Sequence, residues 1–476
     1  MNIYWWVTLC KSGFFMNGIV IYQKFIRNLG WNACESIAYH FLLTLHQMAL
    51  FKVLAYEEYG AIGTAFSLLY LSIWILDFGF DATLAPFWHT WSSTKKNVQR
   101  FVWYNSSASI GGLLFLAALL TSGMPARLLH YKISAPLALI IMLAIGSEVL
   151  RRWCKTVLQL LFETQLMALA ELIFMSIYLV TVWGIYFYGI PLTISTTLLP
   201  LAISSLASVG FCIFLFRRWY QELPENHPSD SVDEHDENNQ SELPSAWRVI
   251  RFRLFAYGNA LSTLPFSSNF LVPLFAVTFG ISAAGLLKLA SSIVHNFTVV
   301  LQKTFGNTCR ALLAHIRSED DNQQEAFLMV THYLYQVLYA LLIFCAINHR
   351  FIARISGAAN TYAGTLLALF FTISFLDNFA ITYEKLYEVN ERSDILCLFN
   401  GLGSILLGCL LFFTSGFISP VTLLLLIALI RLSVLALTTC LTFALYRISP
   451  YKTMEPTVIL CAIVTSLLFF VSLRNP

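Results

Sequence analysis

Polar and ionisable side chains recur at helical spacing inside the apolar segments of this sequence. The segment from residue 60 to residue 82 carries one such stripe, at intervals of three and four: Ser67, Tyr70, Trp74, Asp77 and Asp81. Residues at these intervals share one face of a helix. A charged side chain near the centre of a bilayer costs about 2.5–3.5 kcal/mol, so each of them must face a cavity, a partner or the water boundary.

A second apolar segment carries a similar stripe, formed by Lys288, Ser292 and His295, with Lys303 further along the chain. An ammonium group binds phosphates and other anions as a point charge. Lys288 is therefore the first candidate for an anion contact, although it could also snorkel to the interface or pair with a carboxylate. Lys52 and Lys303 are candidates for later and earlier contacts. His295 is the group whose charge changes near neutral pH.

Amides and a further histidine add to this set of candidates. Ser36, His40 and Gln47 share one face of the first apolar segment, and Asn259 and Asn269 lie in the seventh. A single buried histidine is more often a packing residue with satisfied nitrogens than a functional one. Asp77 is also expected to position the turn that follows it rather than to contact a substrate.

Two groups of charges are expected to form ion pairs. Glu148 lies three and four residues before Arg151 and Arg152, which is the spacing of a pair at a helix end. Arg431 lies in the middle of the twelfth apolar segment, and Glu171 is a candidate partner for it.

Several function classes lack support in the sequence. It contains no GxxxxGK[ST] phosphate-binding loop, no His/Glu metal pair and no CxxC among its ten cysteines. The outer loops are short, whereas a membrane glycosyltransferase or ligase needs a sizeable loop with catalytic groups. The net charge of +3 gives no indication of nucleic-acid binding. We therefore expect neither an enzyme nor a resident cofactor.

Composition predicts the elements that position these side chains. The 476 residues are 58% hydrophobic and 12% charged, whereas soluble domains are about 25% charged. A membrane span needs about 20 apolar residues, and backbone groups in lipid are satisfied only in helices or closed barrels. The expected fold is an all-α membrane protein with spans near 33–52, 60–82, 101–121, 134–150, 164–187, 192–216, 252–278, 281–305, 327–347, 361–381, 396–415 and 419–446.

An acidic, proline-containing stretch divides these spans into two groups. It is expected to be a solvated linker. The Lys and Arg residues favour one set of loops, so the positive-inside rule places the linker in the cytoplasm. The predicted parts are an apolar or interfacial segment 1–30, two six-helix lobes at 31–218 and 248–447, the linker 219–247, and an extra C-terminal span 457–473. A weak similarity between 56–91 and 279–315 predicts pseudo-symmetric lobes around a central cleft.

Two short motifs carry a resemblance to a known family. Glu57-Glu58-Tyr59-Gly60 and Leu76-Asp77-Phe78-Gly79 resemble the turn after the first helix and the end of the second helix in polysaccharide-export flippases. Those proteins belong to the multidrug/oligosaccharidyl-lipid/polysaccharide exporter superfamily. Its two six-helix lobes resemble the organisation of residues 31–446. The linker is longer and more acidic than the family pattern, and the first 30 residues are additional.

The resemblance implies a flippase in the bacterial inner membrane. It would move a polyprenyl-pyrophosphate-linked oligosaccharide, such as an O-antigen or capsule unit, by alternating access. Implied partners are this substrate, membrane lipid, the polysaccharide polymerase machinery and a coupling ion, H⁺ or Na⁺. The alternatives are a cation-coupled multidrug antiporter, which needs a carboxylate deep in an apolar lobe, and a membrane polymerase, ligase or scaffold. Glu171 is the carboxylate on which the antiporter alternative rests.

Overall fold

The computed structural model describes residues 17–80, 94–121, 134–160, 164–223, 246–301, 361–390, 392–414 and 418–446, together with 331, 334 and 338. All regular elements in these ranges are helices, which confirms the predicted all-α fold. The first half of the chain contributes α2 (Asn17–Val53), α3 (Tyr56–Leu76), α6 (Lys95–Thr121), α8 (Ala135–Leu160), α9 (Thr164–Phe187) and α10 (Ile194–Glu222).

The second half contributes α11 (Ala246–Thr263), η2 (Leu264–Phe266), α12 (Ser268–Phe279), α13 (Ile281–Leu301), α16 (Thr361–Val389), α17 (Ser393–Thr414) and α18 (Pro420–Tyr446). The predicted span 252–278 is not one straight helix, because α11 and α12 meet at a bend of 42°. Pro265 lies at this bend. Proline has no backbone N–H to donate and its ring clashes with the preceding turn, which accounts for the break.

Seven of the described helices are long and apolar enough to cross a membrane, or eight if the bent α11–α12 pair is one span. Helices α8 and α16 are not among them, although 26 and 29 residues correspond to about 39 and 44 Å of helix. Both carry several charged side chains, among them Arg151 of α8 and Asp377 of α16, which form ion pairs with other helices. Pairing is what lets such helices lie inside the protein.

Two predicted boundaries differ from the structure. Helix α2 begins at Asn17 and continues without a break to Val53, so residues 17–30 extend the first span instead of forming a separate piece. No proline interrupts this stretch, and an existing helix propagates at little cost. The first residues of the predicted linker belong to α10, which ends at Glu222. Residues 1–16, 224–245 and 457–473 lie outside the described residues, as does most of 327–347.

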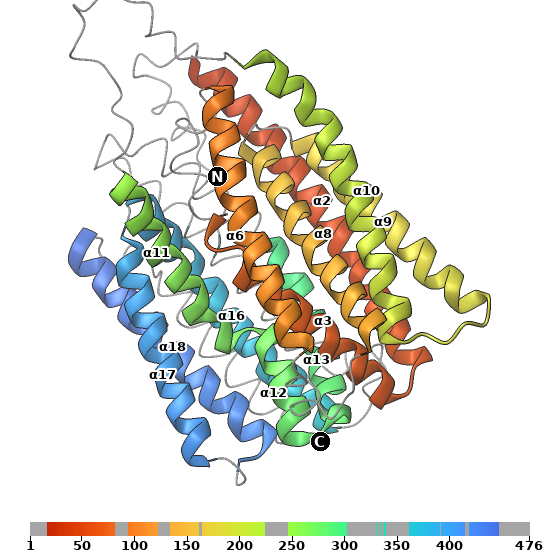
Figure 1. Ribbon diagram of the computed structural model, residues 1–476. Coiled ribbons are helices and arrows are strands. Elements are labelled where there is room, and N and C mark those ends of the chain that lie inside the picture. Colours follow the sequence, from red (N-terminus) through yellow and green to blue (C-terminus); the bar gives the residue numbers. More distant parts are fainter. Residues whose placement is uncertain are drawn as a thin grey trace, which may run out of the picture.

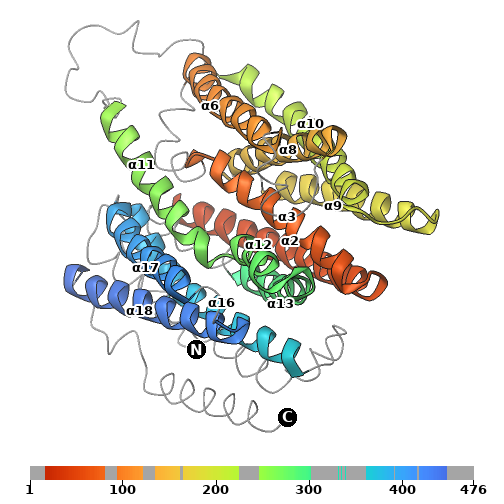
Figure 2. The same cartoon turned by 60° about the horizontal axis from the view of Figure 1, so that its bottom comes forward.

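The helices form two groups that follow the order of the chain. In Figures 1 and 2 the red-to-yellow helices α2 to α10 lie on one side and the green-to-blue helices α11 to α18 on the other. Helix α3 lies at the boundary, because it contacts α8 of its own group and both α12 and α13 of the other. Helix α13 in turn contacts α2. A continuous core of buried apolar side chains crosses this boundary, including Phe66 and Ile73 of α3 and Leu287 of α13.

Glycines allow α3 and α13 to approach closely. A Cβ atom at Gly60 would lie 2.2 Å from the carbonyl oxygen of Ile281, and one at Gly285 would lie 2.8 Å from that of Tyr56. No Cβ atom fits at such distances, so both positions require glycine. The Glu-Tyr-Gly motif thus has a structural reason, since its glycine is where the two halves touch.

We expect Gly60→Ala to separate α3 from α13 and to lower the thermal unfolding temperature of the purified protein. The clash is with backbone, which cannot move aside, and overpacking of this kind typically costs about 1–3 kcal/mol. Gly210→Ala is the matched control, because nothing lies within 4 Å of a Cβ there and alanine favours the helix. Equal unfolding temperatures for both variants would contradict the close approach.

Candidate functional site

Lys288 lies at the boundary between the two groups of helices. Its ammonium group donates a hydrogen bond of 3.3 Å to Ser67 Oγ of α3. Gly63 makes room for the lysine stem, since a Cβ there would lie 2.7 Å from Lys288 Cγ. No carboxylate of a described residue lies within 4.0 Å of the ammonium nitrogen. The structure therefore holds a cation between the halves that no carboxylate of the described helices neutralises.

The other candidates are distributed over several helices. Lys52 is exposed in the last turn of α2, and His295 is exposed on α13, seven residues after Lys288. His40 is buried and its ring lies edge-on to Tyr39, with centroids 5.0 Å apart. Asn269 is half-buried in α12. Asp81 and Lys303 lie outside the described residues.

Asp77 begins a tight turn at the end of α3, and this turn makes a second contact between the halves. It is the C-cap of α3, and Phe78 and Gly79 that follow have φ angles of +47° and +72°. Arg253 of α11 stabilises this turn, because its Nε donates a hydrogen bond of 2.7 Å to the Phe78 carbonyl. A second contact comes from the hydroxyl of Tyr257, which donates to the Ile75 carbonyl at 2.8 Å. The Asp-Phe-Gly motif thus positions a contact with α11, in agreement with the structural role expected for Asp77.

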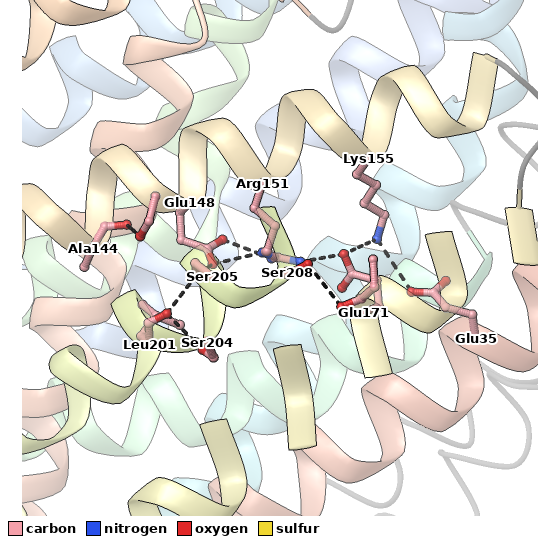
Figure 3. A network of polar contacts seen from close by, with 12 residues as sticks. Glu35, Ala144, Glu148, Arg151, Lys155, Glu171, Leu201, Ser204, Ser205 and Ser208 are labelled. Carbon is pink, nitrogen blue, oxygen red and sulfur yellow. Dashed lines mark hydrogen bonds and ion pairs between the residues drawn. The ribbon is translucent and has the colours of Figure 1, made fainter. Parts of the chain in front are cut away.

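A buried cluster of charges joins three helices of the first half (Figure 3). Arg151 of α8 is at its centre and makes two hydrogen bonds to Glu148, of 3.0 and 2.9 Å. Its third contact is a 2.5 Å ion pair with Glu171 of α9. Lys155, one turn further along α8, lies 3.2 Å from Glu171 and 3.5 Å from Glu35 of α2. We call these five residues the first-half charge cluster.

The composition of this cluster gives it a net charge. Three carboxylates face two cations, so the fully ionised cluster carries one excess negative charge. All three carboxylates are at most 5% exposed, and Ser205 of α10 donates a short hydrogen bond to Glu148. Water screens such groups poorly, so the close ion pairs and hydrogen bonds are what keeps these charges inside the protein. The predicted Glu148–Arg151 pair is confirmed, but it lies inside the protein rather than at an exposed helix end.

A second charged cluster occupies the second half. Arg431 of α18 pairs with Asp377 of α16 at 2.5 Å, so the predicted Arg431–Glu171 pair is wrong. Glu171 is already neutralised by two cations, and it lies in the other half. Arg431 also donates to Asn400 at 2.9 Å, and Asn400 donates to the candidate Asn259 at 2.9 Å. A small pocket here is lined by Arg431, Asn400 and Glu384, among others.

The sequence analysis missed the residues that complete these clusters. Lys155, Glu35 and Asp377 were not identified, and Arg152 was interpreted only as an ion-pair partner. The available signal was the position of each charge within an apolar segment long enough to span a bilayer. Helical spacing identifies a face of one helix, but it does not show which face of another helix meets it.

No protein-family model and no curated protein matches the sequence. Solved structures with the same fold were found. An inward-facing multidrug resistance MATE family transporter of the MOP superfamily aligns with a TM-score of 0.59 and 11% identity, covering 88% of this chain and 99% of that one. An outward-facing multidrug resistance MATE family transporter aligns with a TM-score of 0.57 and 12% identity, covering 94% of this chain and 96% of that one.

A third similar structure is a MOP superfamily transporter from Pyrococcus furiosus, described as having a binding pocket of reverse polarity that suggests a different function. It aligns with a TM-score of 0.56 and 11% identity, over 93% of this chain and 96% of that one. At these identities the likeness concerns the fold alone. The chain therefore has the all-helical membrane fold of the MATE transporters of the MOP superfamily.

Proposed function

We propose that this protein is an alternating-access flippase that moves a polyprenyl-pyrophosphate-linked oligosaccharide across the bacterial inner membrane, from the cytoplasmic to the outer leaflet. The observation that carries the proposal is Lys288, a cation at the boundary of the halves with no carboxylate within 4.0 Å in the part of the chain that the structure describes. An unpaired charge in this position is costly. An anionic substrate would neutralise the charge of Lys288 and offset that cost, whereas an organic cation would be repelled.

The fold supports the mechanism. Two helical groups meet along α3 and α13, and rocking of one group against the other would alternately open the two sides of the membrane. The pyrophosphate would contact Lys288 while the polyprenyl chain stays in lipid. His295, Lys52 and Lys303 remain candidates for further contacts along the path, as do His40, Asp77, Asp81, Asn259 and Asn269. The polysaccharide polymerase machinery is the partner expected to consume the translocated unit.

Coupling to a proton is supported by the first-half charge cluster. The cluster brings three buried carboxylates and two cations together inside the first half. Glu35 has the longest ion-pair distance in the cluster, 3.5 Å to Lys155. Lys155 also pairs with Glu171, so the lysine would keep an ion pair if Glu35 lost its charge.

We expect Glu35→Gln to abolish the stimulation of transport by an imposed pH gradient in proteoliposomes and to leave the rate without a gradient nearly unchanged. The amide keeps the shape of the side chain and removes the exchangeable charge. Glu388→Gln, in the last turn of α16, is the control because Glu388 pairs with Lys385 outside the cluster. A Glu35→Gln variant that still responds fully to the gradient would rule out this carboxylate as the coupling group.

A cation-coupled multidrug antiporter is the second candidate function. The inward-facing and outward-facing neighbours are described as multidrug resistance transporters, and buried carboxylates are present in the first half as this function requires. Those carboxylates lie inside the first half and pair with Arg151 and Lys155, however. At the boundary, Lys288 has no carboxylate of a described residue within 4.0 Å. The two candidates thus predict substrates of opposite charge.

Native mass spectrometry of the protein, gently purified from its own source, tests the proposal. A bound polyprenyl-pyrophosphate glycan supports the flippase and identifies the glycan by its mass. Bulk phospholipid alone, together with tight binding of organic cations, supports the antiporter instead.

A further inference from the structure

Arg152 differs from its neighbour Arg151 in having no anionic partner. Arg151 is enclosed by Glu148 and Glu171, whereas no carboxylate of a described residue lies within 4.0 Å of the Arg152 side chain. Its guanidinium carbon instead lies 5.6 Å from the centre of the Trp74 ring. The five N–H donors of this guanidinium are therefore available on a half-buried side chain.

Trp74 presents an open aromatic face in a helix that is otherwise well packed. Its side chain is 40% exposed, and Ile75 beside it is 41% exposed. Ile73 and Leu76, on the opposite side of α3, are nearly or fully buried. The exposed indole can pack against a flat apolar ring, and the guanidinium beside it can bind an anionic group.

This surface is next in sequence to a contact between the two groups of helices. Arg152 comes from α8 of the first half, and Tyr257 of α11, from the second half, reaches the carbonyl of Ile75 in the same turn. The nearby Asp77 interacts electrostatically with Arg253, which offsets its negative charge. Arg152 is consequently a positive charge at this end of α3 that no carboxylate of a described residue pairs with.

We propose that Arg152 and Trp74 form an inner binding station for the substrate, in which the guanidinium binds the pyrophosphate and the indole carries the first sugar ring. This inference rests on the proposed flippase function. A guanidinium matches phosphate oxygens through paired N–H donors. The C–H edges of a sugar ring carry partial positive charge and pack on the negative face of an aromatic ring.

The station continues the path that Lys288 begins. Ser67, the partner of Lys288, and Trp74 are seven residues apart on one face of α3, which corresponds to about 10.5 Å along the helix. By the predicted orientation, Trp74 lies toward the cytoplasm and Lys288 toward the middle of the membrane. An anion moving outward would pass from Arg152 to Lys288 along the stripe of Ser67, Tyr70 and Trp74.

The test measures binding of two probes to the purified full-length protein by native mass spectrometry: undecaprenyl pyrophosphate, and the same lipid bearing one N-acetylglucosamine. Arg152→Gln is expected to weaken binding of both probes by about tenfold or more, as expected for the loss of a charge-assisted contact. Trp74→Leu is expected to weaken only the glycosylated probe. Arg217→Gln, at an exposed arginine of α10, is the matched control and should bind both probes like wild type.

The outcomes separate this inference from the proposed function. If wild type binds both probes and Arg152→Gln binds them equally well, the inner station is overturned and the flippase stands. If Trp74→Leu weakens both probes to the same degree, the indole does not carry the sugar and that assignment is overturned. If wild type binds neither probe, the proposed function and the station fail together. Unfolding temperatures of all variants close to wild type ensure that lost binding reflects the site.

Discussion

Lys288→Met is expected to remove most transport of a pyrophosphate-linked substrate while leaving the protein folded. Methionine keeps an unbranched stem in the space that Gly63 provides, and it removes the charge and the hydrogen bond to Ser67. A hydrogen bond to a charged group contributes about 1.5–3 kcal/mol, so substrate affinity should fall about tenfold to a hundredfold. Transport of a labelled lipid-linked oligosaccharide into the outer leaflet of proteoliposomes measures the effect.

Two further variants make this result specific. Lys288→Arg keeps the positive charge and should retain part of the transport, limited by the fit of a larger head group against α3. Lys96→Met removes an exposed lysine at the start of α6 and should transport like wild type. Undiminished transport by Lys288→Met would show that the substrate does not use this cation.

Arg151→Leu is expected to cause the largest loss of stability of any single substitution discussed. It would leave Glu148 and Glu171 buried without the guanidinium that makes three contacts to them. Breaking a buried ion pair by removing one partner typically costs about 3–5 kcal/mol. The unfolding temperature of the purified protein should therefore drop strongly, as followed by intrinsic fluorescence on heating.

A compensated variant distinguishes lost pairing from lost packing. Combining Arg151→Met with Glu148→Gln and Glu171→Gln should recover much of the stability, because neither carboxylate is then left buried as a charge without its guanidinium. Arg217→Leu, at an exposed position of α10, should leave the unfolding temperature unchanged. An Arg151→Leu protein that unfolds at the wild-type temperature would contradict the geometry of the cluster.

The helical fold could be predicted from the sequence because the bilayer limits the possibilities. Apolar runs of about 20 residues must be helices there, and helices such as α9, α10 and α17 lie close to the predicted ranges. The break between α11 and α12 was missed, although Pro265 was visible, because proline is tolerated in many membrane helices. The boundary predicted at residue 30 has no counterpart in the structure, where α2 runs without a break from Asn17 to Val53.

The residues of the candidate site could be predicted only separately for each helix. Spacing correctly grouped Ser67, Tyr70 and Trp74 on α3, and it identified Lys288 on α13. It could not show that Lys288 meets Ser67 or that Arg152 lies over Trp74, because the face that one helix presents to another depends on packing of the whole bundle. The same limit explains why Arg431 was assigned to Glu171, when its partner Asp377 lies in α16 of its own half.

The most direct test of the central claim is a paired transport measurement in proteoliposomes that contain only this protein. One set holds a fluorescent undecaprenyl-pyrophosphate oligosaccharide, and the other holds a fluorescent organic cation, with Lys288→Met compared to wild type in both. We predict that wild type translocates the lipid-linked oligosaccharide, that Lys288→Met loses this activity, and that neither protein exports the cation. Export of the cation by wild type, with no movement of the lipid-linked oligosaccharide, would contradict the flippase and identify an antiporter.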